Sequence, residues 1–111
     1  MKKLEWLYSS KKDLAEFPED VIHEIGYALH CAQMGRHYKK SKPFKGYGSG
    51  VFEIVIEYDT NAYRSVYTVE MDDVIYVVHC FQKKSKHGMQ TPKEEMAIIK
   101  QRITRLRASE E

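Results

Sequence analysis

Basic side chains gather in two blocks of this 111-residue chain. Residues 36–46 hold five Lys or Arg and no acid, and residues 79–107 hold eight basic and two acidic residues. Between them, residues 47–78 hold six acidic residues and one basic residue, Arg64. The formal charge of the whole chain is only +2, but this distribution is compatible with one face that attracts polyanions. The alternative is that the lysines only solvate loops and a helix face.

Other patterns of reactive residues are absent or poorly spaced. Cys31 and Cys80 are the only cysteines and belong to no CxxC pair, so we expect free thiols that behave as small apolar residues. Histidines recur every seven residues at 23, 30 and 37, whereas chelation on a helix needs neighbours three or four apart. We therefore expect no metal site and no cofactor, and the chain lacks a glycine-rich phosphate loop and a nucleophile elbow.

The first third of the chain predicts a strand and two helices. Lys3–Tyr8 alternates like a short strand, and Ser9 or Ser10 can cap a helix over Lys11–Phe17. A second helix begins at Pro18 and ends at Gly35, and its apolar residues recur at three- and four-residue spacing. These residues are Val21, Ile22, Ile25, Ala28, Leu29 and Ala32. The glycine-containing residues 36–50 read as a loop.

The remainder predicts an antiparallel meander and a last helix. Strands are expected over Val51–Tyr58, Tyr63–Glu70 and Val74–Phe81, separated by short turns. Thr91-Pro92 then begins a helix with an apolar seam at Met96, Ile99, Ile103 and Leu106. The expected order is β-α-α-β-β-β-α, an α+β fold with one antiparallel sheet, two N-terminal helices and one C-terminal helix.

Composition and length bound the class of protein. With 42% hydrophobic and 12% aromatic residues the chain can build a core, and 111 residues suit a single domain over 1–111. No window approaches the length of a membrane span, and the N-terminus has no secretory signal. We therefore expect a cytoplasmic protein that does not interact with membranes.

Several short motifs occur together in a specific order. They are KPFKGYGSG, GVFEIVIEY, AYRSVYTV, VIYVVHCFQKKSKHGMQTP and a helix that begins EEMAIIKQRI. In this order and spacing the chain resembles the RelE/HigB toxin superfamily, particularly its phage-derived HigB-like branch. The branch has a glycine-aromatic-Glu strand, a Tyr-Arg strand, and a strand that ends in Phe-x-Lys-Lys before Thr-Pro and a helix. The resemblance covers nearly the whole chain and implies a RelE-like fold.

The resemblance also implies an activity. Such toxins belong to type II toxin–antitoxin modules and cleave mRNA in the ribosomal A site, inhibiting translation without a metal. The 2′-hydroxyl attacks the adjacent phosphate, which leaves a 2′,3′-cyclic phosphate and a 5′-hydroxyl. The protein must orient the strand, neutralise charge and move protons. The expected partners are mRNA in the ribosomal A site and a cognate helix-turn-helix antitoxin.

The resemblance transfers roles to particular residues. Arg64 matches the Tyr-Arg strand and is expected to clamp phosphate or stabilise the transition state; the alternative is an ion pair with Glu53 or Glu57. The remaining catalytic candidates follow the last strand: Lys83, Lys84, Lys86 and His87. Clustered cations can lower a lysine pKa and so create a general base. Expected RNA-binding residues are Lys39, Lys40, Lys42, Lys45 and Phe81, although core packing is the alternative for Phe81.

One departure from the branch keeps other functions open. The branch commonly has arginine two residues after the strand glutamate, where this chain has Val55. A phage-derived interaction module whose catalysis has decayed is therefore an alternative to an endoribonuclease. A ParE-like toxin that binds DNA gyrase on the same scaffold is a further alternative. The lysine-rich segment after the last strand and Arg64 favour the nuclease.

Overall fold

The computed structural model of the chain describes residues 1–71, 73–83 and 91–109. Its elements, in chain order, are β1 (Lys3–Trp6), α1 (Ser10–Ala15), α2 (Glu19–Gln33), β2 (Ser41–Pro43), β3 (Val51–Tyr58), β4 (Asn61–Thr68), β5 (Val74–Lys83) and α3 (Lys93–Ser109). The predicted α+β class is confirmed, with one strand more than expected. Among the described residues, no helix is long and apolar enough to cross a membrane.

The strands form one sheet in the order β1-β5-β4-β3-β2. The predicted antiparallel meander is confirmed for β3, β4 and β5, and β2 adds to its edge in antiparallel pairing. The expectation of a purely antiparallel sheet is wrong at the other edge, where β1 pairs with β5 in parallel. Two helices and three strands separate β1 from β5 along the chain, so no tight turn forces these two strands into antiparallel pairing.

β2 lies in the segment that was expected to be a loop. Its three residues pair with β3, and Pro43 lies opposite Phe52. Proline is tolerated on an edge strand because no further strand needs its missing N–H. A three-residue strand that contains proline leaves no alternating pattern to detect, which is why the sequence did not reveal it.

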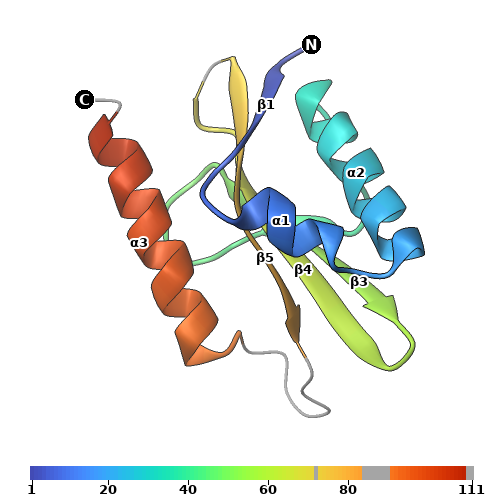
Figure 1. Ribbon diagram of the computed structural model, residues 1–111. Helices are drawn as coiled ribbons and strands as arrows, with labels where there is room; N and C mark the ends of the chain where they lie inside the picture. Colours follow the sequence, from blue (N-terminus) through green and yellow to red (C-terminus); the bar gives the residue numbers. More distant parts are fainter. Residues whose placement is uncertain (72, 84–90, 110–111) are drawn as a thin grey trace.

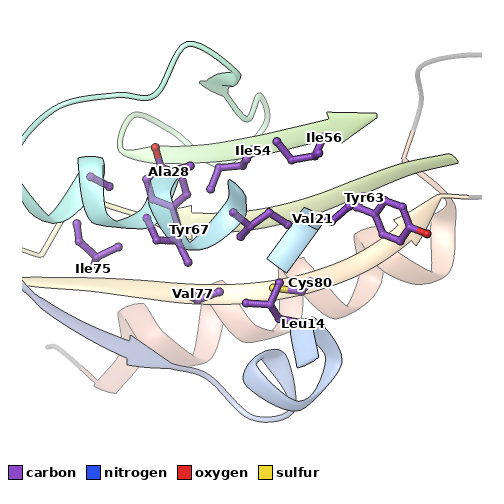
Figure 2. Packing of buried hydrophobic residues seen from close by; sticks show 13 residues of the cluster. Leu14, Val21, Ala28, Ile54, Ile56, Tyr63, Tyr67, Ile75, Val77 and Cys80 are labelled. Carbon is purple, nitrogen blue, oxygen red and sulfur yellow. The ribbon is translucent and has the colours of Figure 1, made fainter. Parts of the chain in front are cut away.

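Helices cover both faces of the sheet, with α1 and α2 on one side and α3 on the other (Figure 1). In Figure 2, Leu14 of α1 and Val21 and Ala28 of α2 point towards side chains of β3, β4 and β5. The apolar stripe predicted for the second helix is confirmed, because Val21, Ile25, Ala28, Leu29 and Ala32 are all buried.

The other face of the sheet packs against α3. Ile99 and Ile103 of this helix form a second core with four residues of the sheet, Val51, Val66, Val78 and Phe81. The far end of the helix is held by Arg107, which donates hydrogen bonds to both carboxylate oxygens of Glu70 and to the carbonyl oxygen of Tyr47. The predicted start of this helix after Thr91-Pro92 is confirmed.

Element boundaries differ from the expectations by a few residues. The second strand of the meander ends at Thr68 instead of Glu70, and the first helix is shorter than expected. The difference that matters is in β5, which continues past Phe81 to Lys83. The sheet, and not a loop, therefore positions the first lysine of the predicted cluster.

Candidate functional site

The face of the sheet that packs against α3 carries polar residues in three neighbouring rows, where a row is a set of residues that pair with one another across the strands. Residues paired across strands share a face, and Val66 and Phe81, which pack on α3, identify the face. The rows are Lys42, Glu53, Val66 and His79; then Val55, Arg64 and Phe81; then Glu57, Ala62 and Lys83. The register thus brings Lys42, Arg64 and Lys83 onto one face, although they are up to 41 positions apart in the sequence.

Arg64 and Glu53 form a buried ion pair in this site. Nη1 of Arg64 lies 3.1 Å from Oε2 of Glu53, and the side chains of the two residues are 3% and 7% exposed. The ion-pair alternative for Arg64 is therefore confirmed, with Glu53 as its partner. On the other side of the same carboxylate, Nζ of Lys42 lies 3.6 Å from Oε1. One carboxylate thus joins a buried guanidinium to a lysine that is 52% exposed.

Lys83 lies at the end of β5 and is 4% exposed. Burial lowers the pKa of its ammonium group, and the nearby positive charges of Arg64 and Lys42 lower the pKa further, while Glu53 acts in the opposite direction. A buried lysine beside other cations releases its proton more readily than a lysine in water. The environment of Lys83 therefore favours loss of its proton.

An open cavity of about 760 Å³ borders Lys42, Glu53 and Arg64. Its polar wall contains Lys42, Lys45, Glu53 and Arg64, and its other lining residues are Pro43, Phe44, Thr91 and Met96. The cavity thus lies between the β2 edge of the sheet and the start of α3. Its cations can hold a phosphate, and its apolar wall offers contact area to a flat ring.

The start of α3 is fixed to β5 on the same face of the sheet. Nε2 of His79 lies 2.7 Å from Oε1 of Glu95, and Arg102 donates a hydrogen bond of 2.9 Å to the carbonyl oxygen of Val78. The His79 ring stacks on Phe81 at a centroid distance of 5.2 Å. These contacts hold the helix that forms one wall of the cavity.

The structure separates the other predicted site residues. Lys42 and Lys45 line the cavity, whereas Lys40 forms an ion pair of 2.8 Å with Glu24 of α2. Lys39 is exposed. Phe81 is 4% exposed within the core beneath α3, as its packing alternative expects, so its contact with RNA stays a prediction. Three catalytic candidates, Lys84, Lys86 and His87, lie outside the described residues.

Sequence reasoning did not identify every residue of the cavity. Phe44, Thr91 and Met96 line it, but each belongs to a segment interpreted only as loop or helix. Glu53 was considered only as a counterion for Arg64, yet its carboxylate faces the cavity. Among the described residues, no group of three or more His, Cys, Asp or Glu side chains could hold a metal ion.

Solved structures with a similar fold are toxins. A double arginine-to-alanine mutant of the E. coli toxin RelE in the free state matches with a TM-score of 0.60 and 13% identity, over 94% of this chain and 96% of that chain. The isolated E. coli RelE toxin matches with a TM-score of 0.56 and 14% identity, over 91% and 98%. The RelBE2 toxin–antitoxin complex from Mycobacterium tuberculosis matches with a TM-score of 0.51 and 13% identity, over 74% and 98%.

The family follows from a comparison of sequences. A search of curated proteins found no significant match. The model of the family described as "Phage derived protein Gp49-like" matches residues 12–104, which include α2, most of α1 and α3, and four of the five strands. The chain therefore belongs to the Gp49-like family of phage-derived proteins, and its fold is that of the RelE toxins.

Proposed function

We propose that this protein is the toxin of a type II toxin–antitoxin module and an endoribonuclease that cuts mRNA in the ribosomal A site in the cytoplasm. The observation that carries the proposal is the buried Arg64 on the wall of an open cavity, with Lys83, a lysine of lowered pKa, in the neighbouring row of the sheet. The RelE-like fold and the Gp49-like family support the toxin assignment.

In this proposal each residue has a defined task. The 2′-oxygen forms a bond to phosphorus while the bond from phosphorus to the 5′-oxygen breaks, and the 5′-oxygen takes a proton from water. Lys83 in its neutral form accepts the proton of the 2′-hydroxyl, and burial and the neighbouring cations, which lower its pKa, favour that form. Arg64 stays protonated at every relevant pH and stabilises the charge that develops on the phosphate oxygens. Lys42 and Lys45 bind the RNA backbone at the cavity mouth.

A decayed interaction module is the second candidate, and Val55 favours it. Val55 lies directly opposite Arg64 on the neighbouring strand, so the arginine common in the related branch would contribute a second guanidinium at this point. Its loss removes one cation from the site.

A toxin that binds DNA gyrase on the same scaffold is the other alternative. It would leave RNA ends unchanged while cell growth still stops.

Mapping RNA ends on translating ribosomes tests the proposal. Purified wild-type protein is expected to produce cuts within A-site codons, with 2′,3′-cyclic phosphate ends. Lys83→Met should reduce the rate of cutting by about 10²-fold or more, the usual contribution of a positioned proton acceptor. The matched control is Lys11→Met, which removes an exposed lysine of α1 and should cut like the wild type. Growth arrest without A-site cuts would overturn the nuclease assignment.

The partner is proposed to be a helix-turn-helix antitoxin that inhibits the toxin. It docks on the basic surface that includes Lys39, Lys42 and Lys45. The toxin–antitoxin complex among the structures of similar fold supports the presence of such a partner. Co-expression with the neighbouring reading frame tests this proposal. We expect restored growth and a complex that dissociates at high salt, because exposed charges are screened.

A further inference from the structure

The cavity already holds a negative charge of its own. Glu53 is 5% exposed, and each of its carboxylate oxygens faces a different cation of the cavity wall. Oε2 lies 3.1 Å from Nη1 of Arg64, and Oε1 lies 3.6 Å from Nζ of Lys42. A phosphate can bind to the same cations, because guanidinium and ammonium groups bind carboxylate and phosphate oxygens alike.

A phosphodiester that enters the cavity therefore meets both attraction and repulsion. Arg64, Lys42 and Lys45 attract it, while the carboxylate of Glu53 lines the same space and repels it. In a partly buried site, a like charge a few ångströms away weakens the binding of an anion by about tenfold or more. The cavity is thus less attractive to RNA than its number of cations suggests.

We propose that Glu53 is a resident counter-anion that holds Arg64 in position and sets the affinity of the cavity for the phosphodiester. When RNA binds, the phosphate competes with the carboxylate for Arg64 and Lys42. Free single-stranded RNA then binds weakly. Tight binding requires additional contacts from the larger particle that holds the RNA strand. This inference rests on the proposed function only in that it takes the natural anion to be RNA.

The direct test compares Glu53→Gln with the wild type in binding assays. The probes are inorganic phosphate, followed by calorimetry, and a six-nucleotide single-stranded RNA, followed by fluorescence polarisation. Glutamine keeps the shape and an acceptor for Arg64 but removes the charge. We expect Glu53→Gln to bind both probes about tenfold more tightly, and the dependence of log K on log salt to steepen by about 0.7.

A matched control separates local from general charge. Glu5→Gln removes an exposed carboxylate from β1, at the opposite edge of the sheet from β2, and should leave the affinity for both probes within about twofold of wild type. Equal gains in the two variants would assign the effect to net charge. Unchanged or weaker binding by Glu53→Gln would assign Glu53 a purely structural role. Either result overturns the inference, as does failure of wild type and variant to bind either probe.

A measurement on the wild type covers the case in which Glu53→Gln fails to fold. The side-chain carboxyl carbon of Glu53 and the guanidinium nitrogens of Arg64 are followed by NMR as inorganic phosphate is added. We expect both sets of signals to shift with the same affinity. A Glu53 signal that stays fixed at saturating phosphate contradicts the competition. Cleavage of RNA on ribosomes is measured separately. If Glu53→Gln binds the probes more tightly but the wild type cuts no RNA, the proposed function is refuted and this inference stands.

Discussion

The buried pair of Arg64 and Glu53 predicts that removal of either partner alone destabilises the fold far more than removal of both. The test is a double-mutant cycle in the free energy of unfolding, with Arg64→Met, Glu53→Leu and the double variant. Both replacements are apolar and close in volume to the original side chains. Lys42 is unchanged throughout, so the cycle isolates the interaction between the two buried groups.

The magnitudes follow from the geometry of the pair. At 3.1 Å two unit charges attract by about 5 kcal/mol at an effective dielectric constant of about 20, and desolvation of both groups offsets most of this. Arg64→Met leaves Glu53 buried with the half-exposed Lys42, whose ion pair contributes about 0–1 kcal/mol, and with the charge of Lys83 nearby. We expect losses of about 3 kcal/mol for Arg64→Met and about 2 kcal/mol for Glu53→Leu. Because an apolar pair replaces a buried ion pair at little cost, the double variant should lie within about 1 kcal/mol of wild type.

Urea unfolding followed by circular dichroism measures the cycle. The expected coupling energy is about 4 kcal/mol, and the single Arg64→Met change should lower the melting temperature by about 12 °C. Additive losses, with a coupling energy below about 0.5 kcal/mol, would refute the assignment of a strong interaction within the site. A double variant that folds as well as the wild type but cuts no RNA would show that the charges are kept for function.

Three further predictions concern single residues of known environment. Because the pKa of Lys83 is lowered, cleavage by the wild type should rise with pH up to that lowered pKa and level off above it, and Lys83→Arg should abolish this rise. Burial raises the pKa of the Cys80 thiol to about 12. A thiol reagent at pH 8 should therefore modify half-buried Cys31 and react with Cys80 only after unfolding. Rapid modification of both cysteines in the folded protein would contradict this. Gly50 has a φ of +90° and a Cβ there would lie 2.9 Å from a neighbouring side-chain carbon, so Gly50→Ala should lose more than about 1 kcal/mol. Gly26 is its control, since a Cβ in this helical position meets nothing within 4 Å, and Gly26→Ala should gain about 0.5–1 kcal/mol in thermal melts.

The parts of the fold that could be predicted are those with a regular apolar pattern. The apolar stripe of α2 was predicted on the face that is buried, and the strand Val51–Tyr58 was predicted with the observed bounds, because periodicity reports burial directly. β2 was not predicted, since three residues with a proline carry no period. The parallel pairing of β1 was not predicted either, because pairing between segments some 70 residues apart depends on the assembled sheet and leaves no local signal.

The candidate site shows the same division. Residue types and order singled out Arg64 and Lys83, but the sequence gives no sign that Lys42 approaches Glu53 while Lys40 pairs with Glu24. The two lysines have different partners because Lys40 precedes β2 and pairs with Glu24 of α2, whereas Lys42 lies within β2 and directly opposite Glu53. The register of β2 on β3, which no local pattern reveals, therefore decides which lysines of the basic block reach the cavity.

Glu53 links the affinity of the site to its reactivity. Its negative charge opposes the lowering of the pKa of Lys83 by burial and by Arg64, and the same charge repels an incoming phosphate. A phosphate that displaces the carboxylate from Arg64 keeps a negative charge near Lys83, so the change in the pKa of Lys83 on RNA binding is smaller than in a site without Glu53. Removing the charge in Glu53→Gln strengthens anion binding and lowers the pKa of Lys83 in the free protein. A nuclease with glutamine at this position would therefore bind free RNA tightly and carry a more reactive base before it reaches its target. Under the proposed function, the buried carboxylate would keep the free protein less active than its cations alone would make it.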